Sequence, residues 1–185
     1  MRRWNARIGA LLLILILVHM VTGAFQLMGI LKGGLPVRKA LSLAMAALLL
    51  VHIILGIIMT KQSLIIRKTE RLHYDKQNVR FWLVRISGVV MIFLVIFHIW
   101  FFAGNGSKVL RLRPFEGGAL AAGLLLVLSL LFHILLNVRP MFTSLVIEKL
   151  RKFVKDTFFI LLIVILVAAA GFVIYYLRWN VFWRE

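Results

Sequence analysis

Five long runs of apolar residues, separated by short polar segments, dominate the chain. Each run is long enough to cross about 30 Å of hydrocarbon as a helix that rises about 1.5 Å per residue. The runs occupy residues 8–30, 40–60, 81–103, 117–138 and 157–177. The pattern therefore predicts an all-α, integral membrane bundle of five helices, with residues 1–185 forming a single transmembrane domain.

Proline positions agree with these boundaries. The three prolines, Pro36, Pro114 and Pro140, all fall between the predicted spans, where a missing backbone N–H does no harm. The first run is too long, and too polar after its apolar part, to be expected as a cleaved signal peptide. We therefore expect five uninterrupted helices and no separate soluble domain.

The composition supports a membrane protein and limits its chemistry. Hydrophobic residues make up 63% of the chain and charged residues 16%, and the mean hydropathy is +1.01. A soluble domain of this size has too little interior to bury so many apolar side chains. The chain contains no cysteine, which excludes disulfides, thiolate-bound iron–sulfur clusters and covalently attached haem.

Basic residues outnumber acidic residues by 23 to 6, which gives a formal net charge of +17. Fifteen of the 23 cations fall on the side of the predicted bundle that holds the N-terminus. They are Arg2, Arg3, Arg7, Lys61, Arg67, Lys68, Arg71, Lys76, Arg80, Arg85, Arg139, Lys149, Arg151, Lys152 and Lys155. The positive-inside rule places this side in the cytoplasm and the C-terminus outside. We therefore expect the cytoplasmic membrane of a bacterium or archaeon, and contact with anionic lipid rather than nucleic acid.

Four of the five histidines lie inside the apolar runs, one in each of the first four: His19, His52, His98 and His133. An ionisable residue inside a membrane segment is costly and usually functional. Neutral imidazole is also a common axial ligand of haem iron. Four such ligands on four helices predict two b-type haems, each bound by two histidines within the bundle.

The depth of each histidine suggests how they pair. His98 is 5 residues from the outer end of its span, and His133 is 5 residues from the inner end. His52 is 8 residues from the inner end, so it can share a level with His133. His19 lies midway along its span and joins His98 partly by elimination. The expected ligands are therefore His19 and His98 for the outer haem iron, and His52 and His133 for the inner one. The alternatives are hydrogen bonds to carbonyls of neighbouring helices, or a proton relay.

A motif in the third span carries a family resemblance. Arg85, Ser87 and Gly88, followed by His98 and Trp100, resemble the Arg-x-Ser/Thr-Gly…His-x-Trp signature of the cytochrome b subunit of succinate dehydrogenases and fumarate reductases. The chain looks most like the five-helix, two-haem type of that family, and the similarity of plan covers nearly its whole length.

Two further segments add to this resemblance. His52 and Gly56 are similar to the family's second-helix His-x-x-x-Gly element, and His133 with Asn137 is loosely similar to its fourth-helix histidine segment. The resemblance implies that the first-helix histidine pairs with the third and the second with the fourth, in agreement with the depths.

The resemblance also implies a function. A subunit of this type transfers electrons between menaquinone or ubiquinone and the iron–sulfur and flavoprotein subunits on the cytoplasmic face of a complex that acts on succinate or fumarate. Two features depart from the family pattern. The chain is short for this family, and no Asp or Glu lies within any span. We therefore do not expect proton transfer across the membrane by a buried acid.

Other polar residues near the span ends are candidate binding groups. Arg85, near the inner face, is expected to contact a haem propionate, with snorkelling to lipid phosphates as the alternative. Thr22, Gln26 and Lys32, near the outer end of the first span, are candidate quinone contacts, and Ser87 offers an inner alternative. Small polar residues in membrane helices more often serve packing. The remaining basic residues at span ends, expected to face lipid headgroups, include Arg38, Lys39 and Arg139.

Two other functions compete with this interpretation. A di-haem anchor of this shape could serve another quinone-linked oxidoreductase, such as a hydrogenase, formate dehydrogenase or heterodisulfide reductase. Those anchors often carry two histidines on one helix, whereas this chain has one per helix. Alternatively, the chain is a small transporter or assembly protein whose histidines relay protons.

Overall fold

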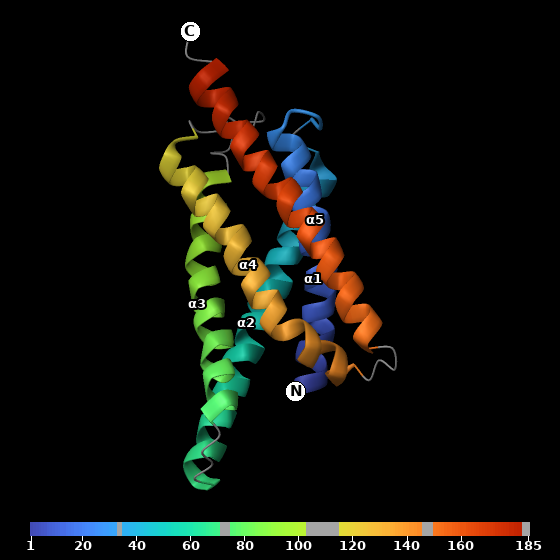
Figure 1. The fold of residues 1–185 in the computed structure, drawn as a ribbon, viewed down its shortest axis with the longest axis vertical. Coiled ribbons are helices and arrows are strands. Elements are labelled where there is room, and N and C mark those ends of the chain that lie inside the picture. The colour runs from blue at the N-terminus through green and yellow to red at the C-terminus, as the bar shows by residue number, and fades with distance from the viewer. Residues whose placement is uncertain (33–34, 71–74, 103–114, 146–149, 183–185) are drawn as a thin grey trace.

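The computed structural model describes residues 1–32, 35–70, 75–102, 115–145 and 150–182 (Figure 1). Within these ranges the protein is helical and contains no strand. Its elements are α1 (Arg2–Leu27), α2 (Pro36–Glu70), α3 (Asp75–Phe102), α4 (Gly117–Ser144), α5 (Leu150–Leu177) and a short π-helix, η1 (Arg178–Phe182). All five α-helices of the described residues are long and apolar enough to cross a membrane, which confirms the predicted number of long apolar helices.

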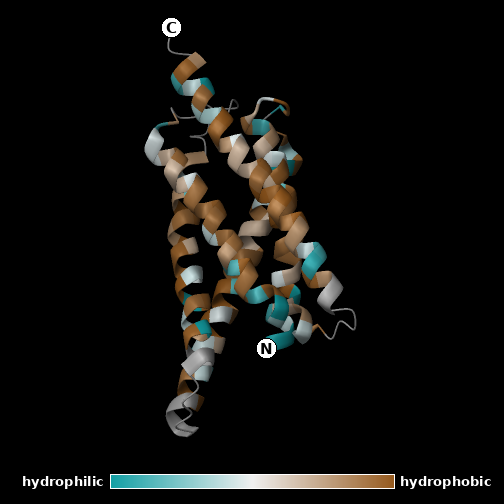
Figure 2. Ribbon diagram, in the orientation of Figure 1, coloured by the Kyte–Doolittle hydropathy of each residue, from teal (hydrophilic) through white to brown (hydrophobic). Residues whose placement is uncertain are grey.

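The middle of the bundle is apolar on its outer surface as well as inside. Ile14, Phe93 and Ile163, from three different helices, are 60%, 69% and 61% exposed. Figure 2 shows the hydrophobic middle in brown, with hydrophilic positions gathered toward the helix ends. Helices satisfy their backbone polar groups internally, so such a surface suits lipid as a solvent better than water.

The helix ends differ from the predicted spans. α2 continues to Glu70 and α3 already begins at Asp75. α1 stops at Leu27, since Gly29 has a φ of +81°, a left-handed conformation typical of helix ends. Hydropathy marks only the stretch that fits hydrocarbon, whereas helical hydrogen bonding continues through polar residues beyond it. The predicted spans therefore match the helices in number and order but not in their ends.

Pro140 lies inside α4, so the prediction that all three prolines fall between spans is wrong. Proline has no N–H to donate to the carbonyl four residues earlier, which leaves the Leu136 oxygen without its helical donor. Arg80 of α3 supplies a donor instead, with its Nη2 atom 2.6 Å from the Leu136 oxygen. The helix continues through the proline to Ser144, because a neighbouring helix satisfies the freed backbone group.

The packed core lies where α5 meets α1 and α4. Its buried side chains are Phe115, Ala119, Val127, Leu161, Ile165, Ala168, Phe172 and Tyr175. Glycine permits the closest helix approach: a Cβ added at Gly171 would lie 3.0 Å from the Cα of Ala24 on α1. Consequently α5, which carries no histidine, packs against two of the four helices that carry one, α1 and α4.

Of the remaining helices, α3 is packed closely and α2 is not. α3 packs along α4, α1 also touches α4, and α2 packs against α1. Among the described residues, the backbone of α2 does not closely approach α3, α4 or α5, and α1 does not closely approach α3. None of the described side chains of α2 is buried. The order of contacts is therefore α2–α1–α4–α3, with α5 covering α1 and α4.

Candidate functional site

His19 of α1 and His98 of α3 lie next to each other. Their ring centroids are 6.3 Å apart and their planes meet at 74°. Since α1 and α3 make no close backbone contact within the described ranges, the two imidazoles extend from separated helices into a shared space. His19 and His98, which are predicted from their depths to share a level, are thus neighbours in the fold.

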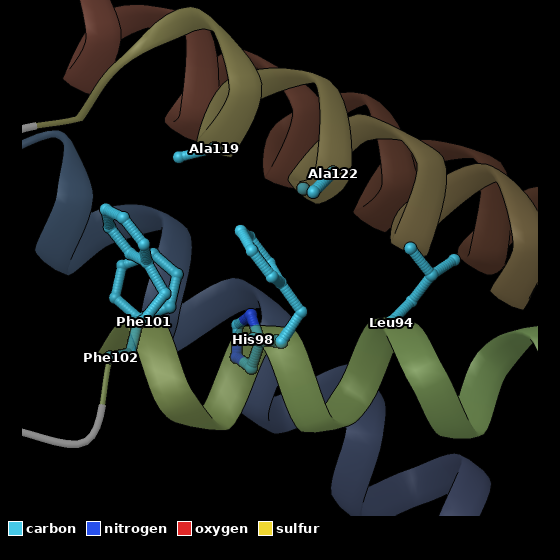
Figure 3. A pocket seen from close by; sticks show the side chains of 8 residues that line it. Leu94, His98, Phe101, Phe102, Ala119 and Ala122 are labelled. Atoms are coloured by element: carbon cyan, nitrogen blue, oxygen red, sulfur yellow. The ribbon is translucent and has the colours of Figure 1, made fainter.

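An apolar pocket borders His98 between α3 and α4 (Figure 3). Leu94, Phe101 and Phe102 extend from α3 toward two alanines of α4, with His98 at the base. The ring centroid of Phe102 is 4.8 Å from that of His98. These side chains shield the imidazole with aromatic and aliphatic groups on the side that faces α4.

His52 of α2 and His133 of α4 are the second expected pair. Glycines let the other two helices approach them. A Cβ added at Gly9 of α1 would lie 3.8 Å from Cε1 of His52, and one at Gly88 of α3 would lie 3.7 Å from Cε1 of His133. Helices α1 to α4 therefore all reach this level.

The two groups lie at different heights in the bundle. On α1, ten residues separate Gly9, which faces His52, from His19. On α3, ten residues also separate Gly88, which faces His133, from His98. At the helical rise, both helices give a separation of about 15 Å between the levels. The histidines therefore occupy two layers. His19 and His98 form the layer nearer the α1–α2 turn, and His52 and His133 form the layer in the other half of the bundle.

Ser87 contacts one of these histidines directly. Its Oγ lies 2.9 Å from Nδ1 of His133 and 3.0 Å from the carbonyl oxygen of Val84, to which it donates. Ser87 is only 7% exposed, because it lies on the face of α3 that packs along α4. The carbonyl oxygen of His133 accepts a hydrogen bond of 2.7 Å from the Asn137 amide. Nδ1 and the carbonyl oxygen of His133 thus both have defined neighbours.

The surroundings of the other histidines are open or unsatisfied. Nδ1 of His52 is buried and has no hydrogen-bond partner in the part of the chain that the structure describes. Gly23 and Gly56 lie four residues after His19 and His52, on the same helix faces. A Cβ added at either glycine would meet nothing within 4 Å. Space beside two of the four imidazoles is therefore left by the absence of a side chain.

The structure places Arg85 against its own helix. Its Nη1 donates to the Phe81 carbonyl at 2.9 Å, and its Cζ lies 3.4 Å from the centroid of the Phe81 ring. The cation is therefore partly neutralised by a carbonyl dipole and an aromatic face. Its expected contact with a propionate stays a prediction.

The predicted quinone contacts on α1 are not brought together. The hydroxyl of Thr22 donates to the carbonyls of Val18 and His19, at 2.8 and 3.2 Å, so it is engaged with its own helix. Among the described residues, no hydrogen bond joins Thr22, Gln26 and Lys32, and Lys32 is exposed beyond the end of α1. A quinone site there remains a prediction.

In chemical terms, the site offers imidazoles in pairs. Within the described residues, no group of three or more His, Asp or Glu side chains could hold a metal ion. Axial ligation of a haem needs only two neutral imidazoles, with the porphyrin nitrogens supplying the other four ligands. His19 and His98, which the structure brings together, could hold a metal that already carries other ligands.

Sequence reasoning missed some residues of this site. Gly9 and Met141 lie beside His52, with Met141 Sδ 3.7 Å from the Cβ position of Gly9. A lone glycine and a lone methionine in apolar helices carry no pattern that distinguishes them from packing residues. Gly88 belongs to the motif quoted above, but its contact with His133 depends on how α3 and α4 cross.

No protein-family model, no curated protein and no solved structure matches this chain.

Proposed function

We propose that the chain is a di-haem b membrane subunit, located in the cytoplasmic membrane of a bacterium or archaeon. It transfers electrons between membrane menaquinone or ubiquinone and the cytoplasmic flavoprotein and iron–sulfur subunits of a succinate dehydrogenase or fumarate reductase complex. The observation that carries the proposal is the placement of His19 beside His98 on two helices that do not pack against each other. The resemblance of the third-helix motif supplies the type of complex.

The separation of the two rings fits a shared axial metal. Metal–nitrogen bonds to histidine are about 2 Å long, so two imidazoles on opposite sides of one metal have centroids about 6 Å apart. The observed 6.3 Å between His19 and His98 is compatible with this arrangement. Nδ1 of His52 is buried and has no hydrogen-bond partner among the described residues, which likewise suits a bound group better than bulk solvent.

The chain contributes ligation, space and shielding. His19 and His98 would hold one haem iron, and His52 and His133 the other. When bound, haem supplies one-electron redox chemistry. Gly23 and Gly56 leave room for a flat macrocycle beside the helix backbone. The aromatic side chains around His98 exclude water, and burial of this kind is one means by which a protein sets a redox potential.

Basic side chains would bind the haem carboxylates. Nη1 of Arg38, near the start of α2, is buried without a hydrogen-bond partner among the described residues. A buried guanidinium nitrogen of this kind suits an anionic group. Arg38 lies at the same end of the bundle as the His19–His98 pair, and Arg85 lies at the opposite end. We therefore assign Arg38 to the outer haem and Arg85 to the inner one.

The cation-rich end of the bundle is the proposed docking face. The starts of α1 and α3 and the end of α4 lie at this end, and the segments on the same side of the predicted bundle carry fifteen of the 23 cations of the sequence. With the N-terminus in the cytoplasm, this face meets the iron–sulfur and flavoprotein subunits, which carry the centres that a chain without cysteine lacks. Quinone would react in the membrane near a haem, at the Thr22–Gln26–Lys32 end or beside Ser87.

An absorption spectrum tests the proposal. The purified chain should show a b-type α band after reduction with dithionite, with two haems per polypeptide. His98→Ala and His133→Ala should each remove one haem, because each histidine belongs to a different pair. His73→Ala is the matched control; His73 lies outside the described residues and is predicted to be a loop histidine.

Each result has a distinct meaning. A reduced spectrum without an α band would overturn the haem assignment and favour the proton-relay alternative. Loss of both haems in His98→Ala, with a folded chain by circular dichroism, would contradict the pairing. Copurification with hydrogenase or formate dehydrogenase subunits, rather than with a flavoprotein that oxidises succinate, would contradict the proposed complex while leaving the haems in place.

A further inference from the structure

The hydroxyl of Ser87 is a buried polar group with two neighbours and one proton. Its Oγ lies 3.0 Å from the Val84 carbonyl oxygen and 2.9 Å from Nδ1 of His133. A carbonyl oxygen can only accept, so the Ser87 proton is used by Val84. With the hydroxyl donating to Val84, its oxygen faces His133 as an acceptor, and the tautomer of His133 that matches this orientation carries its proton on Nδ1.

This proton position determines which nitrogen of His133 can bind a metal. A neutral imidazole carries one proton, so a protonated Nδ1 leaves the lone pair of Nε2 free. Metal-bound histidines commonly donate their other N–H to a neighbouring acceptor, which selects the tautomer and orients the ring. In this protein the acceptor is Oγ of Ser87 on α3, and it contacts the ring of His133 on α4.

Neighbouring residues make this contact possible. Gly88 follows Ser87 and places no side chain against the His133 ring, whose Cε1 would lie 3.7 Å from a Cβ at that position. The back-bond from Ser87 to Val84 limits rotation of the hydroxyl. The oxygen is therefore held in place by its own helix before any ligand binds.

We propose that Ser87 is a positioning residue for His133. It selects the tautomer with a proton on Nδ1 and presents Nε2 to the iron of the inner haem. This inference rests on the proposed haem function, and it assigns to His133 a hydroxyl that the sequence alone makes a quinone candidate. A hydrogen bond that Nδ1 donates also increases the basicity of Nε2. The bond should therefore stabilise the oxidised iron and lower its potential.

The experiment compares three variants in the full-length purified chain. Ser87→Ala removes the acceptor, Ser87→Thr keeps a hydroxyl, and Ser63→Ala is the control. Ser63 is a suitable control because its hydroxyl donates only to the Met59 carbonyl of its own helix, at 2.8 Å. The inner haem is identified in redox titrations as the component that His133→Ala lacks.

Ser87→Ala should raise the midpoint potential of the inner haem and weaken its retention about tenfold, within the range usual for loss of a partner to a metal ligand. The outer haem should not change. Ser87→Thr should restore both properties, and Ser63→Ala should match the unmodified chain. An inner haem with the same potential and occupancy in Ser87→Ala as in the unmodified chain would overturn the inference.

A second measurement does not depend on haem. In the haem-free chain labelled with ¹⁵N-histidine, the His133 resonances, assigned by their loss in His133→Ala, should show a proton on Nδ1. In Ser87→Ala the proton should shift toward Nε2. If the unmodified chain binds no haem, the proposed function fails, and the ¹⁵N spectra alone still decide whether Ser87 sets the tautomer. A proton on Nε2 in the unmodified chain would overturn the inference even if haem binds.

Discussion

Two kinds of glycine serve opposite purposes in the membrane helices. Gly171 and Gly123 lie against other side chains or backbone: their added Cβ atoms would be 3.0 Å from Ala24 and 3.1 Å from Phe172. Gly56 has nothing within 4 Å of its Cβ position. The first kind permits close packing of helices. The second keeps a volume open beside a histidine, and only the second kind should matter for a bound cofactor.

The packing glycine gives a prediction about stability. Gly171→Leu should lower the free energy of unfolding by about 1–3 kcal/mol, because the new side chain must displace the α1 backbone. Gly118→Leu is the control, since its Cβ position is open. Thermal unfolding in mild detergent measures both variants. Equal melting temperatures for the two would show that α1 and α5 do not approach closely at Gly171.

The open glycine gives a prediction about cofactor content, which rests on the proposed function. Gly56→Leu should leave the melting temperature of the haem-free chain within a few degrees, since it displaces nothing. It should nevertheless lower the inner haem content, because the leucine side chain occupies the space beside His52. Haem per polypeptide is measured from the reduced spectrum. Full occupancy of both haems in Gly56→Leu would contradict the role given to this space.

At the scale of the helices, α4 depends on α3 for an internal hydrogen bond. Pro140 removes the helical donor for the Leu136 carbonyl, and the guanidinium of Arg80 replaces it at 2.6 Å. Such a bond couples two helices through the backbone of one of them. It also occupies Arg80, a cation that would otherwise only face lipid headgroups.

A double-mutant cycle tests this coupling. Arg80→Leu should cost about 1 kcal/mol of unfolding free energy, which is usual for a hydrogen bond between membrane helices. In the Pro140→Ala background the cost should be smaller, since an alanine N–H restores the helical bond to Leu136. Arg139→Leu, three residues from the same carbonyl and exposed, is the charge-matched control. Equal costs of Arg80→Leu in both backgrounds would contradict the replacement of one donor by the other.

The helices also show how far sequence reasoning reaches. Apolar run length predicts the five spans and their order, because a membrane requires about 20 apolar residues per crossing. It does not predict where α2 ends or that α4 continues through Pro140. Hydropathy does not distinguish a polar helix end from a polar loop, and it does not show a hydrogen-bond donor from another helix. The histidine groups follow from residue type and depth. The contacts of Ser87 and Gly9 depend on helix rotation and crossing, which periodicity does not encode in helices that are apolar on all sides.

At the scale of the whole molecule, the unequal charges of the two ends predict the orientation of the chain. In the sequence, fifteen of the 23 cations fall in the segments next to the start of α1, the α2–α3 connection and the end of α4. This asymmetry should place that end in the cytoplasm. It also follows that the two ends of α4 face different compartments.

The absence of cysteine makes this easy to measure. Thr143→Cys and Glu116→Cys place single thiols at exposed positions at opposite ends of α4. A membrane-impermeant maleimide added to intact cells should label Glu116→Cys at once. It should label Thr143→Cys only after the membrane is opened, and the unmodified chain not at all. The reverse pattern would invert the orientation and move the proposed docking face outside.

The contact between Ala24 and Gly171 has a consequence for biogenesis. Ala24 of α1 and Gly171 of α5, 147 residues apart in the chain, pack closely against each other. During synthesis α1 can contact only α2, and later α4, until α5 has been made. Contacts of such large sequence separation form late. A ribosome stalled before α5 would therefore leave α1 and α4 without the helix that packs against both of them.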